Sequence, residues 1–282
     1  MLKMKKFNLH SHSSFCDGKN TLEEMTLAAI DRGLYCFGFS AHAPVPFENT
    51  FALREQDVAA YLSEISRLKA KYADKIHLYA SMEFDYITDT VEDIRQRAEA
   101  YGLDYIIASV HQVKEKGKEA MWFIDGGKQE TWDNGLRDVF GGDVRRGVET
   151  FYSQSVAMIH KVKPDIVGHF DKVKMHNKER CFSQNDPWYK ELVMWLIEEA
   201  VAENLICEVN TRGLYKGRTD DFFPSTEWIR EAAIKGLRMT ISTDCHKTGE
   251  VDLLFEQAVQ AMKEAGHKYV WLFDGKWKAE KL

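Results

Sequence analysis

Short apolar runs alternate along the chain with segments in which apolar residues recur at helical spacing. In the segment 57–72, apolar residues stand three or four positions apart, as on one face of an amphipathic helix. The segment 20–33 carries Thr21 and Glu24 at the spacing of a capping box, and Gly33 predicts where that helix ends. The apolar runs between such segments are short enough to be buried strands.

The alternation can be followed over almost the whole chain. Strands are predicted at 7–10, 35–42, 75–84, 105–111, 165–170, 205–210, 238–246 and 268–273. Helices are predicted at 20–33, 57–72, 91–102, 144–161, 187–203, 226–235 and 251–264. Repeated β-α units with short links predict an α/β fold with a parallel sheet, and seven or eight units favour a barrel over an open sheet.

Residues 114–142 interrupt this rhythm. They are rich in Gly, Lys and Asp and contain Trp122 and Trp132. We expect a long functional loop here, because long structureless loops are otherwise uncommon. With neither a repeat nor a low-complexity linker in its 282 residues, the chain is predicted to form one domain over 1–282.

Composition narrows the classes of function. The formal net charge of -6 argues against a nucleic-acid-binding surface, which is normally basic. The five cysteines are odd in number and lack Cys-x-x-Cys spacing, which argues against a disulfide framework and a thiolate zinc site. The N-terminus lacks the apolar core of a signal peptide, and no run approaches the length of a membrane span. We therefore expect a cytoplasmic protein without membrane partners.

Histidines and carboxylates collect where the predicted strands end. His10 and His12 are two residues apart, so their side chains point to one face of an extended strand. Side chains at or just past strand ends are His10, His12, His42, Glu83, His111, His169, Asp244 and His246, and Asp17 follows in a turn before Gly18. In a parallel barrel these ends open on one face. Nine ligands exceed what one ion takes and suffice for three if a carboxylate such as Glu83 bridges two of them.

The segments "HSHSSFCDG", "MEFDY", "SVHQV", "VGHFDKV" and "STDCH" together resemble the PHP phosphoesterases, named for polymerase and histidinol phosphatase. The resemblance spans nearly the whole chain and is closest to the stand-alone histidinol phosphate phosphatases. It implies a distorted (β/α)7 barrel and a trinuclear metal centre. By motif, His10, His12, Glu83 and Asp244 would hold one ion, Glu83, His111 and His169 the second, and Asp17, His42 and His246 the third. Many relatives place a histidine where this chain has Asp17.

The resemblance further implies hydrolysis of a phosphate monoester, with L-histidinol phosphate of histidine biosynthesis as the expected substrate. A hydroxide shared by two ions would attack phosphorus, and Asp244 or His246 could protonate the leaving oxygen. The ligand types suit zinc, iron or manganese alike. A nucleotide or phosphotyrosine substrate, or a binding module without turnover, remains an alternative. The sequence does not indicate an oligomeric state.

Candidate substrate contacts come from two kinds of side chain. Arg212, Lys216 and Arg218 follow the predicted strand at 205–210 and could bind phosphate. Phe15, Trp122 and Trp132 could face the imidazole and ammonium groups, although aromatic side chains more often only fill the core. The histidines at 77, 160, 176 and 267 lie away from strand ends and are interpreted as surface or structural residues.

Overall fold

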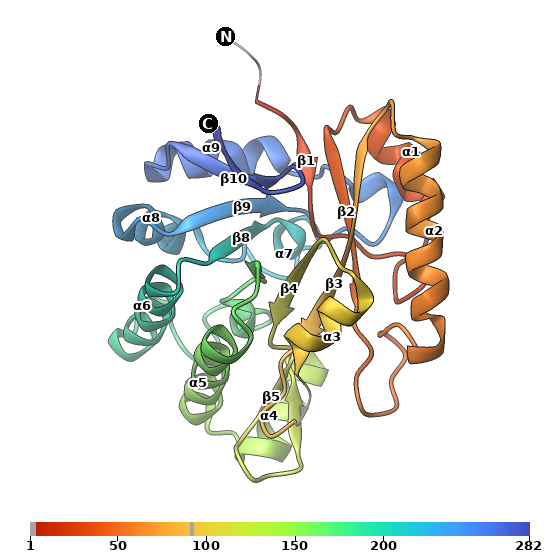
Figure 1. Cartoon of the computed structure of the whole chain (residues 1–282). Coiled ribbons are helices and arrows are strands. Elements are labelled where there is room, and N and C mark those ends of the chain that lie inside the picture. The colour runs from red at the N-terminus through yellow and green to blue at the C-terminus, as the bar shows by residue number, and fades with distance from the viewer. Residues whose placement is uncertain (1–3, 91–92) are drawn as a thin grey trace.

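Seven parallel strands form the centre of the computed structural model, which describes residues 4–90 and 93–282. Their order in the sheet is β1 (Phe7–Asn8), β2 (Cys36–His42), β3 (His77–Asp85), β4 (Tyr105–Ser109), β7 (Ile166–Val167), β8 (Ile206–Asn210) and β9 (Arg238–Ser242). The sheet curls until its two edges meet: Ser11 bridges to Cys245, and the His12 amide donates to the Cys245 carbonyl at 2.8 Å. The predicted distorted (β/α)7 barrel is therefore confirmed as a nearly closed barrel (Figure 1).

Helices surround the strands (Figure 1). They are α1 (Leu22–Asp31), α2 (Val58–Lys71), α3 (Ile94–Tyr101), α4 (Gln129–Phe140), α5 (Val144–Val162), α6 (Pro187–Ala202), α7 (Arg212–Tyr215), α8 (Thr226–Lys235) and α9 (Phe255–Ala265), with 3-10 turns at Glu55–Asp57, Lys172–Lys174 and Thr248–Glu250. The capping box of Thr21 and Glu24 is present at the start of α1. Residues 91 and 92 of the helix predicted at 91–102 lie outside the described residues.

The segment 114–142 is not the long loop that its composition predicts. It contains a hairpin of β5 (Gln112–Lys114) and β6 (Met121–Phe123), followed by α4. Trp132, Leu136 and Phe140 stand four residues apart on α4 and are all buried. This helical spacing was obscured by the glycines and polar residues around it. The prediction of a loop was therefore wrong, because this buried apolar stripe packs the segment as a helix.

The predicted last strand also lies elsewhere than expected. β10 (Tyr269–Phe273) pairs antiparallel with β11 (Trp277–Lys281) and is not part of the seven-stranded sheet.

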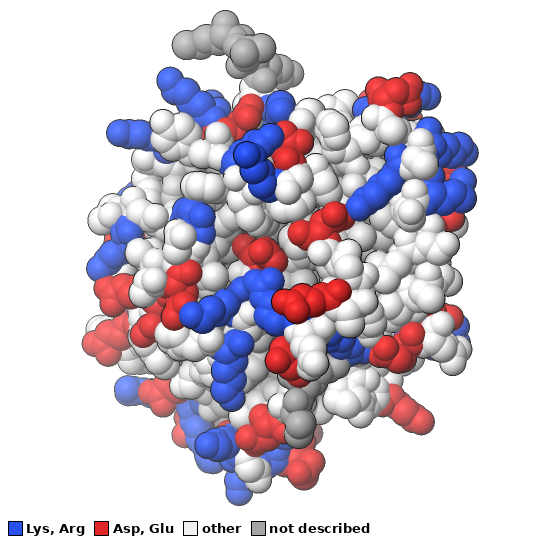
Figure 2. All heavy atoms as spheres, in the orientation of Figure 1, with Lys and Arg blue, Asp and Glu red and all other residues white. Residues whose placement is uncertain are grey.

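None of the described helices combines the length and apolar character that crossing a membrane requires. On the face shown in Figure 2, basic and acidic side chains are interspersed.

Candidate metal centre

The barrel brings all nine predicted ligands to one end of its strands. His42 and Glu83 are direct partners in the register between β2 and β3, so their side chains lie next to each other. The others come from the ends of β1, β4, β7 and β9 or from the segments just after them. Eight of the nine residues are buried, and Asp17, whose side chain is 33% exposed, lies at the rim. The structure thus assembles the complete predicted set.

The first group surrounds one oxygen of Glu83. His10 Nε2 and His12 Nε2 lie 3.2 and 3.6 Å from Glu83 Oε2. Asp244 Oδ1 lies 3.3 Å from His12 Nε2 and 3.9 Å from His10 Nε2. His10, His12 and Glu83 are close enough to share one ion, with Asp244 beside them.

The second group uses the other oxygen of the same carboxylate. His169 Nε2 and His111 Nε2 lie 3.1 and 3.5 Å from Glu83 Oε1, and 3.3 Å from each other. Ser109 Oγ donates to Glu83 Oε1 at 2.6 Å and so fixes the direction of the carboxylate. Glu83 therefore has one oxygen in each group, which is the geometry of a bridging ligand.

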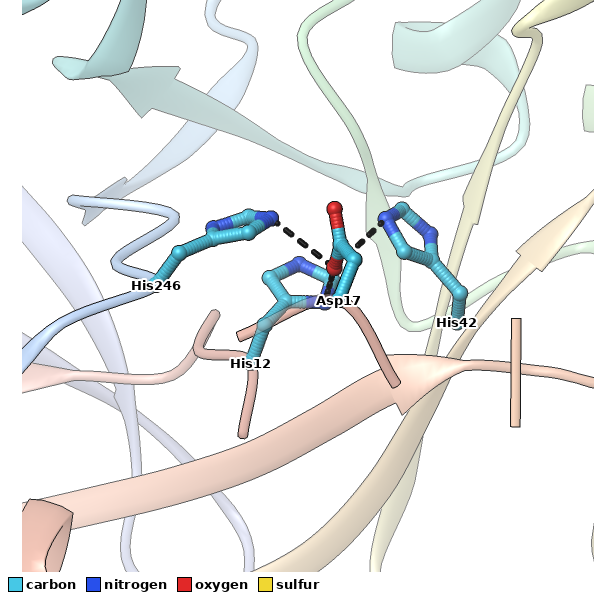
Figure 3. Close-up of side chains that lie close together, drawn as sticks. All are labelled: His12, Asp17, His42 and His246. Atoms are coloured by element: carbon cyan, nitrogen blue, oxygen red, sulfur yellow. Dashed lines mark ion pairs between the residues drawn. The ribbon is translucent and has the colours of Figure 1, made fainter. Parts of the chain in front are cut away.

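The third group gathers around Asp17. His246 Nε2 lies 3.1 Å from Asp17 Oδ1, and His42 Nε2 and His12 Nδ1 lie 3.8 and 3.9 Å from it. Figure 3 shows the three rings turned toward this carboxylate. His12 is added here to the predicted trio, because its two ring nitrogens face different groups. Gly18 permits the tight turn after Asp17, since a Cβ there would lie 2.5 Å from the Ser13 amide nitrogen.

The first and third groups contain buried polar atoms that a positively charged ion could satisfy. His10 Nε2, His12 Nε2 and Asp17 Oδ1 are buried and have no hydrogen-bond partner among the described residues. Buried polar atoms are normally satisfied, and histidine and carboxylate are suitable ligands for divalent transition metals. The residues present therefore fit divalent metal ions.

Electrostatics at the site follow from burial and close packing. Burial opposes charge on Glu83, but His10, His111 and His42 outweigh it and hold the pKa of this carboxyl well below its usual range. Burial, with His246 and His42 nearby, lowers the pKa of His12 to about 3. Metal binding requires ionised carboxylates and neutral imidazoles, so His10, whose pKa Glu208 and Glu83 raise well above its usual value despite burial, must release a proton when an ion binds.

The backbone at Asp244 takes an uncommon conformation. Its φ of 49° lies in the left-handed region, which few residues other than glycine adopt. Such conformations persist where the surrounding structure enforces them, often at functional sites. Here the turn places Asp244 against the first group and His246 against the third.

The PHP domain family matches residues 8–212, which is more than half of the chain. The chain belongs to the PHP family.

Curated relatives and solved structures match nearly the whole chain and cover nearly all of their own length. The histidinol-phosphatase of Bacillus subtilis (strain 168) is 27% identical over 271 residues, covering 90% of this chain and 98% of the relative. The crystal structure of histidinol phosphate phosphatase from Lactococcus lactis, complexed with zinc, L-histidinol and phosphate, matches with a TM-score of 0.73 at 22% identity, over 97% of this chain and 99% of that one. A structure from Listeria monocytogenes matches with a TM-score of 0.78 at 20% identity, over 89% and 99%. These structures share the PHP barrel fold.

A buried carboxylate behind the ligands was missed by the sequence reasoning. Glu208 on β8 has no exposed surface, and its Oε2 faces His10 Nδ1 at 2.9 Å. It also accepts from the His169 amide at 2.9 Å and from Ser242 Oγ at 2.5 Å. A glutamate within the apolar strand "LICEVN" was the available signal. Glu208 fixes the ring of one ligand and the backbone of another.

We expect Glu208→Gln to weaken metal binding about 10- to 100-fold, because glutamine has one acceptor oxygen and can hold only one of His10 Nδ1 and the His169 amide. Metal titration of the stripped protein measures this directly. The exposed Glu198, paired with Lys235, provides the control Glu198→Gln. Equal metal affinity in both variants and the unsubstituted protein would assign Glu208 a purely packing role.

The predicted basic residues occupy different places around the PHP site. Arg212 is buried and donates to the Asp244 carbonyl at 2.9 Å, so it lies against the ligands. Lys216 Nζ is 3.0 Å from Glu250. Arg218 Nη1 lies 3.8 Å from Asp125 Oδ1. Arg212 is thus the one of the three in contact with a ligand residue.

The aromatic candidates divide in the same way. Trp122 and Trp132 are fully buried, and their indole nitrogens donate to the Trp132 and Val173 carbonyls. Their rings fill the core where β6 and α4 meet. Phe15 packs edge-on against Tyr61 at 5.5 Å and is partly exposed. It lines a cavity of about 440 Å³ together with Asn49.

The histidines predicted to lie outside the centre contact other groups. His160 pairs with Glu199 and Glu203 on α6 and just after it. His176 and His267 face the carbonyls of Gly126 and Ile229. His77 begins β3, where its ring lies 4.8 Å from that of Tyr35.

Proposed function

We propose that this chain is a histidinol-phosphatase, a metal-dependent enzyme that hydrolyses L-histidinol phosphate to L-histidinol and phosphate. The observation that carries the proposal is the shared carboxylate of Glu83, which joins two groups of buried histidines at the mouth of a PHP barrel. The substrate rests on relatives named histidinol-phosphatase that align over nearly the full chain.

The proposed centre holds three divalent ions, one in each group. Ions held side by side would lower the pKa of a water molecule and neutralise charge on the phosphoryl group. Glu83 would bridge the first two sites, whereas His12, whose neutral imidazole has a single free lone pair, would bind one ion through one ring nitrogen and keep its proton on the other. The donor set of histidine and carboxylate suits zinc, iron or manganese.

Arg212 is the proposed phosphate contact nearest the ligands. Its guanidinium is held by the Asp244 carbonyl and lies 3.6 Å from Glu250, so its position is set before substrate arrives. A planar guanidinium suits a phosphoryl group because it can donate two parallel hydrogen bonds. Lys216 shares Glu250 with Arg212 and completes this side of the proposed subsite.

Asp244 and His246 lie where an acid for the leaving oxygen could stand, at the first and third groups. His246 Nδ1 faces the Asp244 carbonyl at 3.0 Å, and its Nε2 faces Asp17. With both nitrogens engaged, His246 is better placed as a ligand than as a proton donor. Asp244 stays ionised beside His10 and Arg212, since these cations overcome burial and keep its pKa well below the usual range. The geometry therefore favours ligand roles for both.

Substrate choice tests the proposal. We expect kcat/KM for L-histidinol phosphate to exceed that for p-nitrophenyl phosphate at least about a hundredfold, since contacts to the rest of the substrate are made in the transition state. Steady-state kinetics on both compounds, with a nucleotide and phosphotyrosine alongside, measures this. A clear preference for either of the latter would reject the histidinol-phosphatase assignment. Absence of any turnover in metal-loaded protein would favour a binding module.

Two substitutions separate phosphate recognition from recognition of the remainder. Arg212→Ala should lower kcat/KM for both compounds, because both carry a phosphate. Phe15→Ala should lower it for histidinol phosphate selectively, because only that compound carries the imidazole and ammonium groups. Equal losses on both compounds for Phe15→Ala would remove Phe15 from the substrate site.

A further inference from the structure

A buried lysine lies beside the second group and plays no part in the contacts described so far. Lys172, in the 3-10 turn after β7, has a side chain that is 2% exposed. Its ammonium lies 2.9 Å from Asp125 Oδ1 and 5.4 Å from the centre of the Phe223 ring. Burying an ammonium is costly unless it is paired, so this position calls for an explanation.

Asp125 links this lysine to the metal-ligand groups. The carboxylate follows β6, and its Oδ2 lies 3.8 Å from His111 Nε2, the nitrogen that faces Glu83 and His169. Its Oδ1 lies near both Lys172 and Arg218, the latter at 3.8 Å. The ammonium of Lys172 is therefore only one carboxylate away from the second group.

The ion pair leaves hydrogen-bonding capacity unused. The 2.9 Å contact with Asp125 Oδ1 can use at most one of the three N–H donors of the Lys172 ammonium. Among the described residues, Asp125 is the only polar partner of the Lys172 ammonium, so its N–H donors are available. Two cations, Lys172 and Arg218, share one carboxylate, and the surplus positive charge favours an anion.

We propose that Lys172, anchored by Asp125, contacts the phosphoryl group of the substrate beside the second group. This inference rests on the proposed phosphatase function and adds a residue outside the nine ligands and the basic segment 212–218. Lys172 would donate to a phosphoryl oxygen, while Asp125 keeps the ammonium directed toward the second group.

The test compares Lys172→Met, Asp125→Asn and the double variant in metal-loaded enzyme. Lys172→Met removes the charge but keeps the apolar stem. We expect the apparent Kd for inorganic phosphate, measured by calorimetry, to rise about 10- to 100-fold, the range of one charge-assisted hydrogen bond. The kcat/KM values for p-nitrophenyl phosphate and L-histidinol phosphate should fall together, because both substrates carry the phosphate.

The double variant separates this role from mere packing. Lys172→Met alone leaves the Asp125 charge buried, so the melting temperature should fall, and adding Asp125→Asn should recover it. Phosphate affinity should stay low in the double variant. Recovery of phosphate affinity together with stability would overturn the proposal. Loss of about one metal equivalent in Asp125→Asn would also overturn it, since the carboxylate would then be a ligand.

Lys174 provides the matched control. It is also buried, but it pairs with Asp171 at 2.8 Å and donates to the Phe222 carbonyl at 2.7 Å. Lys174→Met should lower the melting temperature without changing phosphate affinity. Because phosphate binding is read directly, failure of histidinol phosphate as a substrate would reject the proposed function without deciding the role of Lys172. An unchanged phosphate Kd in Lys172→Met would reject that role alone.

Discussion

Glu83→Gln is expected to lower kcat by at least about three orders of magnitude and to release at least one metal ion. Glutamine keeps the shape of the side chain but has one acceptor oxygen where Glu83 offers two, and it carries no charge. The two oxygens face separate histidine groups at 3.2 and 3.1 Å, so one of the groups must lose its Glu83 oxygen and both lose the shared negative charge. Two neighbouring cations would then repel each other without compensation.

Elemental analysis and single-turnover kinetics of the same sample measure both effects. The control is Glu203→Gln, a partly exposed carboxylate paired with Lys163 away from the ligands, which should change neither metal content nor kcat. A Glu83→Gln protein with normal metal content and near-normal kcat would show that the carboxylate does not bridge.

Complete removal of metal is expected to abolish turnover and to lower the melting temperature by at least about 8 °C. Ligands that bind only the folded state stabilise it by about 4 kcal/mol when present a thousandfold above Kd, and each kcal/mol corresponds to about 2–4 °C in a chain of this size. The three groups of facing histidines and carboxylates lose that stabilisation together.

Calorimetry before and after chelation, followed by titration with zinc or manganese, tests this expectation. Full recovery should need more than two equivalents. Full activity with one equivalent or fewer would reject the trinuclear centre, and an unchanged melting temperature after verified removal would show that the ions do not bind the folded chain more tightly than the unfolded chain.

Most of the ligands could be predicted because they stand at or just past the ends of apolar runs, and these runs become the strands of the barrel. When these runs become parallel strands, the histidine or acid at the end of each run lies at the same end of the barrel. His42 and Glu83 therefore become direct neighbours in the register of β2 and β3. The sequence also predicted the helix start at Thr21, since a capping box is a local signal.

The residues that were missed depend on long-range contacts. Glu208 lies inside an apolar strand, and only the closed barrel shows that it faces His10 rather than the helices outside. Asp125 and Lys172 are brought together by the hairpin, which the glycine-rich composition concealed. Spacing along the sequence does not reveal such pairs, because the two residues lie far apart in the chain and meet only in the folded barrel.

The barrel closes between β1 and β9, where Ser11 meets Cys245, and this closure limits the order in which the metal centre can form. During synthesis, His10 and His12 leave the ribosome early, whereas Asp244 and His246 emerge more than two hundred residues later. The first and third groups need ligands from both ends of this span. A nascent chain can therefore assemble the Glu83, His111 and His169 group first, and complete loading of the centre reports that the barrel has closed.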